Sequence, residues 1–406
     1  MESFINPFRP GAGQQPPYLA GRKNETEKFK ELLNQKPILK NLILTGLRGV
    51  GKTVLLETFK PIAQQDKWYW TGTDLSESAG NTEQSFSIRL LADLSVLISP
   101  FTIKEEEIRA IGFNSQSNLI ETKYSYSFLH DIYSKTPGLE ADKLKRVMEF
   151  VWDIVKDKVK GIILAYDEAQ ILKDKASEKQ YPLSLLLEVI QFIQRKEIPY
   201  LLILTGLPTL YPNLIEARTY AERMFHVMNL TKLNEADTKE AISKPIDEKQ
   251  TPVRFTELGV SEIIKYSSGY PYFIQFFCRE AFDLFLQQKN MGITNPDIKI
   301  SNFVQKLDSD FYAGRWGRVT ERQKDLLFII AKLSTANEEF TVKDIVTKSN
   351  EITNPFSQAY VSNTLVKLID FGLIYKNSRG KYSFAVPLLA DYINRQNSSV
   401  ENMSDI

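Results

Sequence analysis

Over about its first 230 residues the chain alternates between short apolar runs and longer segments with the 3.6-residue spacing of helices. Three of the runs lack polar alternation, which predicts strands buried on both faces of a parallel sheet, and a fourth is rich in aromatic residues. The expected strands are 38–45, 67–73, 161–166 and 199–206, and helical spacing is clear at 24–34 and 182–195. Strands that alternate with helices in this order predict a doubly wound α/β domain with right-handed crossovers, which we place at residues 21–229.

Between the second and third expected strands, residues 81–160 are dominated by helical spacing and polar loops. The pattern predicts helices at roughly 83–98, 103–111, 119–133 and 139–158. These helices could be crossovers of the α/β domain, and part of the region could be an insertion into it.

The second half of the chain is patterned differently, because the apolar strands stop at about residue 230. Four helical segments, at 234–248, 255–268, 271–289 and 301–315, predict an all-helical domain over residues 230–315. After a polar break, three helices and a hairpin follow, which is the element order of a winged helix-turn-helix over residues 320–395. The helices are expected at 320–333, 341–349 and 357–370, and the hairpin strands at 372–376 and 381–386.

The two ends of the chain are expected to lie outside these domains. Residues 1–20 are dense in Pro and Gly, which excludes regular structure and favours an extended arm laid on another part of the molecule. Residues 396–406 are polar, so we expect a disordered tail.

Composition narrows the functional classes. The net charge of +1, from 51 basic and 50 acidic residues, excludes a global signature of polyanion binding, so any nucleic-acid surface must be a local patch. The single Cys278 excludes an intrachain disulfide and a multi-cysteine zinc site, and His130 and His226 alone exclude a histidine-rich metal site. No signal peptide is recognisable and no apolar run approaches the roughly 18–20 residues that span a bilayer, so we expect a cytoplasmic protein without a membrane partner.

Between the first expected strand and the helix after it, residues 46–53 read Gly-Leu-Arg-Gly-Val-Gly-Lys-Thr, the G-x-x-x-x-G-K-[ST] phosphate loop. Its glycines let the backbone approach a polyphosphate, and its N–H groups face the anion together with the positive end of the helix. Lys52 can reach the β- and γ-phosphates and the Thr53 hydroxyl can ligate Mg²⁺. The alternative is an ordinary glycine-rich turn. The predicted ATP- or ADP-binding residues are Gly46, Leu47, Arg48, Gly49, Val50, Gly51, Lys52, Thr53 and Val54.

Two carboxylates, Asp167 and Glu168, follow the apolar strand 161–166. Phosphoryl transfer needs a carboxylate at the metal and a group that orients or deprotonates the attacking water. Asp167 fits the first role beside Thr53, and Glu168 fits the second, although an acidic loop after a strand is also common. Thr205 closes a strand that could lie between those of the phosphate loop and Asp167, where its hydroxyl could contact the γ-phosphate or the water.

Arg218 and Arg223 are the candidates for an arginine that accelerates hydrolysis by contacting the γ-phosphate of a neighbouring molecule. Each could equally be a surface arginine paired with Glu216 or Glu222.

The expected third helix and wing of the C-terminal domain carry amide, hydroxyl and basic side chains, which suit phosphate and base-edge contacts with duplex DNA. These residues are Ser357, Gln358, Ser362, Asn363 and Lys367 on the helix, and Lys376, Asn377, Arg379 and Lys381 on the wing. However, residues 320–395 hold ten Lys and Arg against eight Asp and Glu, a net of +2, and DNA-binding domains are usually more basic. A winged helix that binds a protein partner therefore stays open as an alternative.

These motifs together carry a resemblance. The order of Tyr18-Leu19-Ala20-Gly21-Arg22, Gly46–Thr53, Asp167-Glu168, Thr205-Gly206-Leu207-Pro208 and Ser268-Gly269-Tyr270-Pro271 is similar to that of bacterial and archaeal AAA+ ATPases of the replication-initiator, origin-recognition-like group, with features of STAND signalling ATPases. The resemblance covers nearly the whole chain except residues 81–160. It implies an AAA+ core, a helical lid at 230–315 and a C-terminal winged helix.

By that resemblance, Tyr18, Leu19 and Arg22 would line an adenine pocket, Thr205 would be sensor 1, and Arg223 would be the arginine finger. Replication initiators also carry a sensor 2 arginine shortly after the lid glycine, whereas this chain reads Gly269-Tyr270-Pro271-Tyr272-Phe273. The Gly-x-Pro form resembles the STAND pattern, in which Pro271 would pack near the adenine. The sequence therefore predicts a slow Mg²⁺-dependent ATPase that acts as a nucleotide switch, associates with DNA or a protein, and is a candidate for homo-oligomerisation with ATP.

Overall fold

The computed structural model of the chain describes residues 4–111, 114–249, 251–293, 298–377 and 380–404. Its centre is a parallel sheet of five strands in the order β2-β5-β6-β1-β7. The strands are β1 Asn41–Thr45, β2 Trp68–Thr71, β5 Gly161–Tyr166, β6 Tyr200–Gly206 and β7 Phe225–Asn229. The predicted doubly wound α/β fold is confirmed, and β6 lies between β1 and β5 as its sequence suggested. Strand β7 was not predicted from the sequence.

Helices cover both faces of this sheet, because successive residues of each strand point to opposite faces. In β5, Ile162 and Leu164 pack in one core with α4 to α8, whereas Ile163 packs in a second core with α1 and α2. The helices of this layer are α1 Lys23–Leu33, α2 Lys52–Gln65, α3 Glu77–Gly80, α4 Glu83–Ile98, α5 Tyr126–Lys135, α6 Glu140–Val155, α7 Pro182–Arg195, α8 Leu210–Ala217 and α9 Ala221–Met224, with short 3₁₀ turns η1 Ala169–Ile171 and η2 Ala176–Glu178.

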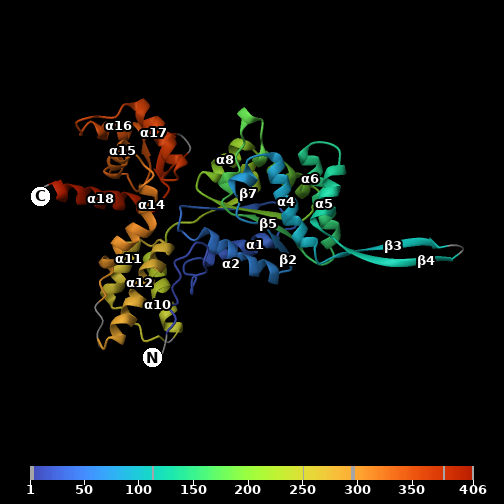
Figure 1. Cartoon of the computed structure of the whole chain (residues 1–406), viewed down its shortest axis with the longest axis horizontal. Coiled ribbons are helices and arrows are strands. Elements are labelled where there is room, and N and C mark those ends of the chain that lie inside the picture. Colours follow the sequence, from blue (N-terminus) through green and yellow to red (C-terminus); the bar gives the residue numbers. More distant parts are fainter. Residues whose placement is uncertain (1–3, 112–113, 250, 294–297, 378–379, 405–406) are drawn as a thin grey trace.

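Residues 81–160 are not entirely helical, which corrects the prediction for that region. Helices α4 and α6 match two of the expected helices, but β3 Thr102–Ile111 replaces the helix predicted at 103–111. It pairs residue for residue with the antiparallel strand β4 Asn114–Lys123, so the helix predicted at 119–133 is divided between β4 and α5. The Glu-rich window 103–111 favours helix by intrinsic propensity, and only the pairing of the two segments decides otherwise. Figure 1 shows this hairpin projecting far from the α/β layer.

The lid region is helical, but its last element is broken. Helices α10 Glu235–Glu248, α11 Glu257–Ser267 and α12 Pro271–Asn290 match the predicted ones. Instead of one helix at 301–315, the chain forms the succession η3 Ile300–Phe303, α13 Val304–Leu307, the π-helical η4 Asp308–Tyr312 and α14 Ala313–Trp316. A π-helical turn of this kind is rare and often marks a functional position.

The C-terminal part has the three helices and the small antiparallel sheet of a winged helix, in the strand order β8-β10-β9. Its elements are α15 Glu321–Ala331, β8 Phe340–Thr341, α16 Val342–Ser349, α17 Gln358–Asp370, β9 Ile374–Lys376, β10 Lys381–Phe384 and α18 Leu389–Ser404. Helix α18 packs on α15 and continues to Ser404, where a disordered tail was predicted from residue 396. A polar composition is typical of exposed helices as well as of disordered chains, so composition alone could not distinguish the end of α18 from a disordered tail.

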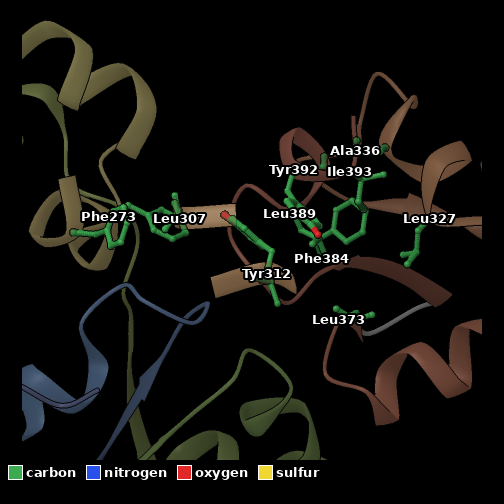
Figure 2. Close-up of a cluster of buried hydrophobic side chains, with 14 of the residues drawn as sticks. Phe273, Leu307, Tyr312, Leu327, Ala336, Leu373, Phe384, Leu389, Tyr392 and Ile393 are labelled. Carbon is green, nitrogen blue, oxygen red and sulfur yellow. The ribbon is translucent and has the colours of Figure 1, made fainter. Parts of the chain in front are cut away.

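The lid and the C-terminal part share one hydrophobic core, separate from the two cores of the sheet. Figure 2 shows Tyr312 between Phe273 and Leu307 on one side and Leu389 and Tyr392 on the other. Its ring stacks on Tyr392, with centroids 4.7 Å apart, and its hydroxyl donates to the Pro387 carbonyl at 2.9 Å. The two parts therefore form one packed body beside the α/β layer.

The N-terminal arm belongs to this body. Phe8 is fully buried in the lid core against Phe255 and Phe282, and Asn6 Nδ2 donates to Asp283 Oδ1 at 2.8 Å. From the lid the arm reaches the α/β layer, where the Gln15 amide donates to the Val54 carbonyl. It thus bridges the two bodies.

Candidate nucleotide-binding site

The turn between β1 and α2 has the geometry of a phosphate-binding loop. Gly51, the residue before α2, has a left-handed φ of 92°, and Gly49 has a φ of 76°. A Cβ on Gly46 would lie 2.4 Å from the Leu230 carbonyl oxygen, so only glycine fits there. The turn places the N-terminus of α2, with its unpaired N–H groups and the positive end of the helix dipole, at the phosphate loop.

Lys52 is the buried cation of this loop. Its Nζ donates to the carbonyl oxygens of Gly46 and Leu47, each at 2.9 Å, and no carboxylate among the described residues forms an ion pair with it. Burial lowers the pKa of the ammonium to about 8, although the nearby charges of Glu168 and Asp167 act in the opposite direction. A buried ammonium that is satisfied only by neutral carbonyls is suited to an incoming polyanion.

Thr53 and Asp167 come together from α2 and the end of β5. The Thr53 hydroxyl donates to Asp167 Oδ2 at 2.5 Å, and Asp167 is buried. Burial raises the pKa of the Asp167 carboxyl, against the effect of its hydrogen bonds from Thr53 and the Glu168 N–H. A hydroxyl and a carboxylate in contact at the start of the loop helix are ligands that suit Mg²⁺ or its water shell.

Glu168 is held in an unusual conformation, with a positive φ of 51°. Its carboxylate accepts a hydrogen bond from the Gln170 amide, and the Gln170 side-chain oxygen accepts from the Leu207 N–H at 3.1 Å. Gln170 therefore ties the carboxylate to the loop that follows β6. Left-handed backbone in a non-glycine residue is costly and tends to occur at functional positions.

Lys52, Thr53 and Glu168 border a cavity of about 420 Å³, which lies between the α/β layer and the lid body, and Asp167 is connected to it through Thr53. Its charged lining residues are the cations Arg9, Arg22, Arg48, Lys52 and Arg315 and the single carboxylate of Glu168. The volume is within the roughly 300–1,000 Å³ of small-molecule sites, and the excess of positive charge suits a polyphosphate. The buried ammonium, the Thr53–Asp167 pair and this cavity all fit a Mg²⁺-bound nucleotide.

The residues predicted for the adenine end lie in the same cavity. Tyr18, Leu19, Arg22 and Pro271 all line it, as do Gly49, Val50, Gly51 and Val54. The Tyr18 hydroxyl donates to Glu240 of α10 at 2.8 Å, and Arg22 donates to the carbonyls of Val50 and Thr231. Leu47 instead borders a second cavity, between the phosphate loop and the C-terminal part.

Thr205 and the two candidate arginines do not reach the cavity. Thr205 is fully buried, and its hydroxyl has no hydrogen-bond partner in the part of the chain that the structure describes. Arg223 is exposed in α9, just before β7 at the amino ends of the strands, whereas the phosphate loop lies at their carboxyl ends. A role for Arg223 therefore requires a second copy of the chain. Arg218 lies 3.8 Å from Glu188, which was not one of its expected partners.

Several lining residues were not predicted as site residues, among them Arg9, Gln275, Phe311 and Arg315. The proline- and glycine-rich composition of residues 1–20 indicated an arm laid on the molecule but not where it lies. Nothing in the sequence places Arg315 within reach of a loop more than 260 residues earlier.

The residues predicted to contact DNA are divided by the structure. Ser357, Gln358, Asn363 and Lys367 lie exposed at α17, with Ser362 half-buried. Lys376 is exposed in β9, but Asn377 and Lys381 both contact the carboxylate of Glu339, at 2.7 and 2.8 Å. Arg379 lies outside the described residues.

Comparisons with known proteins agree with this architecture. A family described as a domain of unknown function, DUF8462, matches residues 309–393, and the curated proteins contain no match in sequence. The Walker-type ATPase PABY2304 of Pyrococcus abyssi is 17% identical over 93% of this chain and 96% of its own, with a TM-score of 0.58. The ADP form of the Aeropyrum pernix ORC2 protein is 12% identical over 95% of this chain and 96% of its own, with a TM-score of 0.56. The predicted likeness to origin-recognition-type AAA+ ATPases is therefore confirmed at the level of the fold.

Proposed function

We propose that the chain binds Mg²⁺-ATP in the cavity between the α/β layer and the lid and hydrolyses it slowly to ADP and phosphate. The observation that carries this proposal is the convergence of Lys52, the Thr53–Asp167 pair and Glu168 at a cavity whose charged lining residues are mostly cations. The fold shared with a Walker-type ATPase and with an ADP-bound protein supports it.

Each residue has a separate role in this proposal. Lys52 turns from the Gly46 and Leu47 carbonyls to the β- and γ-phosphates, whose negative charge offsets the desolvation of its ammonium. Thr53 and Asp167 hold Mg²⁺, which supplies charge neutralisation at the phosphates when bound. Glu168 orients and deprotonates the attacking water, and Gln170 keeps its carboxylate in place.

The decisive experiment is phosphate release by the wild type and by Glu168→Gln. We expect the variant to bind ATP with unchanged affinity and to lose turnover by about 10²-fold or more, because general-base catalysis contributes about 10²–10⁴-fold. Glu178→Gln, at an exposed position in η2, is the matched control. Turnover at the wild-type rate in Glu168→Gln would remove Glu168 from this role.

We further propose that the nucleotide state acts as a switch for the C-terminal winged helix, which associates with duplex DNA through α17 and the wing. The exposed Gln358, Asn363 and Lys367 support this target. Duplex affinity that falls with salt, and falls further in a variant with Arg379 and Lys381 both changed to Ala, is the expected result. No binding of duplex at low salt would refute it.

A protein partner is the second candidate, because Glu339 already neutralises Lys381 in the wing. In that case ATP should drive oligomerisation or partner docking without any dependence on DNA. Light scattering with ATP, with and without duplex, distinguishes the two.

A further inference from the structure

Two arginines from distant parts of the chain face the same end of the cavity. Arg48 is in the phosphate loop, and Arg315 is in α14, at the junction of the lid and the C-terminal part. A series of contacts places Arg315 near the phosphate loop. Its guanidinium lies 5.0 Å from the centroid of the Phe311 ring, and that ring contacts Tyr272. The Tyr272 N–H in turn donates to the carbonyl of Gly49 in the loop.

Neither arginine is paired with an acid in the part of the chain that the structure describes. Among the described residues, no carboxylate forms an ion pair with Arg48 or Arg315, and the buried Nε of Arg48 has no hydrogen-bond partner. Arg315 donates to a neutral acceptor, the Phe311 carbonyl, at 2.7 Å. Burial is the main cause that lowers the pKa of the Arg315 guanidinium, and the positive charges of Arg48 and Arg318 lower it further. Such a cluster of like charges is unfavourable unless an anion joins it.

Both arginines are also coupled to the C-terminal part. Arg315 follows the π-helical turn whose Tyr312 stacks on Tyr392 and whose Asp308 pairs with Arg395 of α18, with the Nε–Oδ2 distance at 2.9 Å. The Arg48 guanidinium lies beside Gly372, just after α17, where a Cβ would be 3.5 Å from its Nη2. A displacement of either guanidinium would therefore be transmitted to the body that carries α17.

We propose that Arg48 and Arg315 together bind the terminal phosphate of a nucleoside triphosphate within one chain, and that this contact sets the position of the C-terminal part. The inference rests on the proposed ATP binding and names how the site distinguishes ATP from ADP. Arg315 supplies from α14 the cation that is missing after Gly269-Tyr270-Pro271. Loss of the terminal phosphate removes the shared anion, so the two guanidinium groups repel and the bodies separate.

The test compares affinities for ADP and for a non-hydrolysable ATP analogue, both with Mg²⁺, in full-length variants. We expect the wild type to prefer the triphosphate and Arg315→Ala to lose about tenfold or more of that preference, the value of one charged hydrogen bond, while ADP affinity stays near the wild-type value. Arg315→Lys should restore part of the preference. Arg146→Ala, at an exposed arginine of α6 that does not line the cavity, should leave it unchanged.

The structural readout is the distance between labels on the α/β layer and on α17, measured by energy transfer with each nucleotide. The wild type should change distance between the two nucleotides, and Arg315→Ala should not. A wild-type ADP-to-ATP affinity ratio in Arg315→Ala would overturn this inference while leaving the proposed ATPase intact. Absence of any nucleotide binding by the wild type would instead refute the proposed function, and this inference with it.

Discussion

Replacing Phe8 with alanine should release the N-terminal arm from the lid and speed the exchange of nucleotide. Phe8 is 0% exposed, and its ring lies 6.4 Å from both Phe255 and Phe282, measured between centroids. Removal of a buried phenylalanine costs about 3–5 kcal/mol. The other anchors of residues 4–15 that the structure describes are individual hydrogen bonds, made by Asn6, the Phe8 carbonyl, the Arg9 N–H and Gln15, so we expect the arm to depend mainly on this ring.

A loss of that size lowers the ratio of docked to undocked arm by between about 10² and 10⁴-fold. Residues 9–14 and Pro16 line the cavity, so an undocked arm opens one of its walls. We expect the dissociation rate of a fluorescent ADP, followed by stopped flow, to rise at least about tenfold. The rise is smaller than the change in the ratio of docked to undocked arm, because only part of that change affects ligand release.

Hydrogen exchange of residues 9–20 shows independently whether the arm has undocked. Ile5→Ala is the matched control, because Ile5 is 83% exposed and its truncation leaves the core intact. Fast exchange in the arm together with an unchanged dissociation rate would refute the view that the arm retains the nucleotide.

Two further predictions concern Lys52 and Tyr312. Burial lowers the pKa of Lys52 to about 8, below its value in an unfolded chain. The nucleotide-free protein should therefore gain stability as the pH rises from about 8 toward 10.5, because the unfolded chain then binds more protons than the folded one. Phosphate binding, in contrast, requires the protonated form of Lys52. Calorimetry in buffers of different ionisation enthalpy should therefore detect proton uptake on Mg²⁺-ATP binding at pH 8.5 and none from Lys52 at pH 6.5; no uptake at pH 8.5 would contradict this. Tyr312→Phe leaves the Pro387 carbonyl without its hydrogen-bond donor, so it should lower the free energy of unfolding in urea titrations by about 1–2 kcal/mol. An unchanged urea midpoint would show that this bond does not stabilise the junction of the lid and the C-terminal part.

The class of fold and the centre of the site follow from local patterns along the chain. Strands that are apolar on both faces need a layer of helices on each side, so the apolar runs within 38–45, 161–166 and 199–206 indicated a parallel sheet without knowledge of any contact. The phosphate loop was equally local, because its glycines, Lys52 and Thr53 act through the backbone geometry of one turn. Asp167 and Glu168 could be assigned to the same edge of the sheet, since the carboxyl ends of parallel strands meet there.

Other features depended on pairings between segments that no local window contains. The helix expected at 103–111 is a strand because residues 114–123 pair with it, and β7 forms although its short sequence carries little signal of its own. The tail predicted from residue 396 is instead the end of α18, whose earlier turns pack on α15. In each case tertiary contacts outweigh a weak local preference.

The walls of the cavity likewise depend on contacts between distant segments. Tyr18 and Pro271 were expected there, but Arg9 and Arg315 line the cavity only because Phe8 is buried in the lid and Tyr312 joins the lid to the C-terminal part. Arg223 could be named as a candidate from the sequence, yet the sheet places it at the opposite edge from the loop. Local sequence specifies a backbone turn and the residue types it carries, whereas the charge that faces the turn is set by how distant apolar surfaces pack.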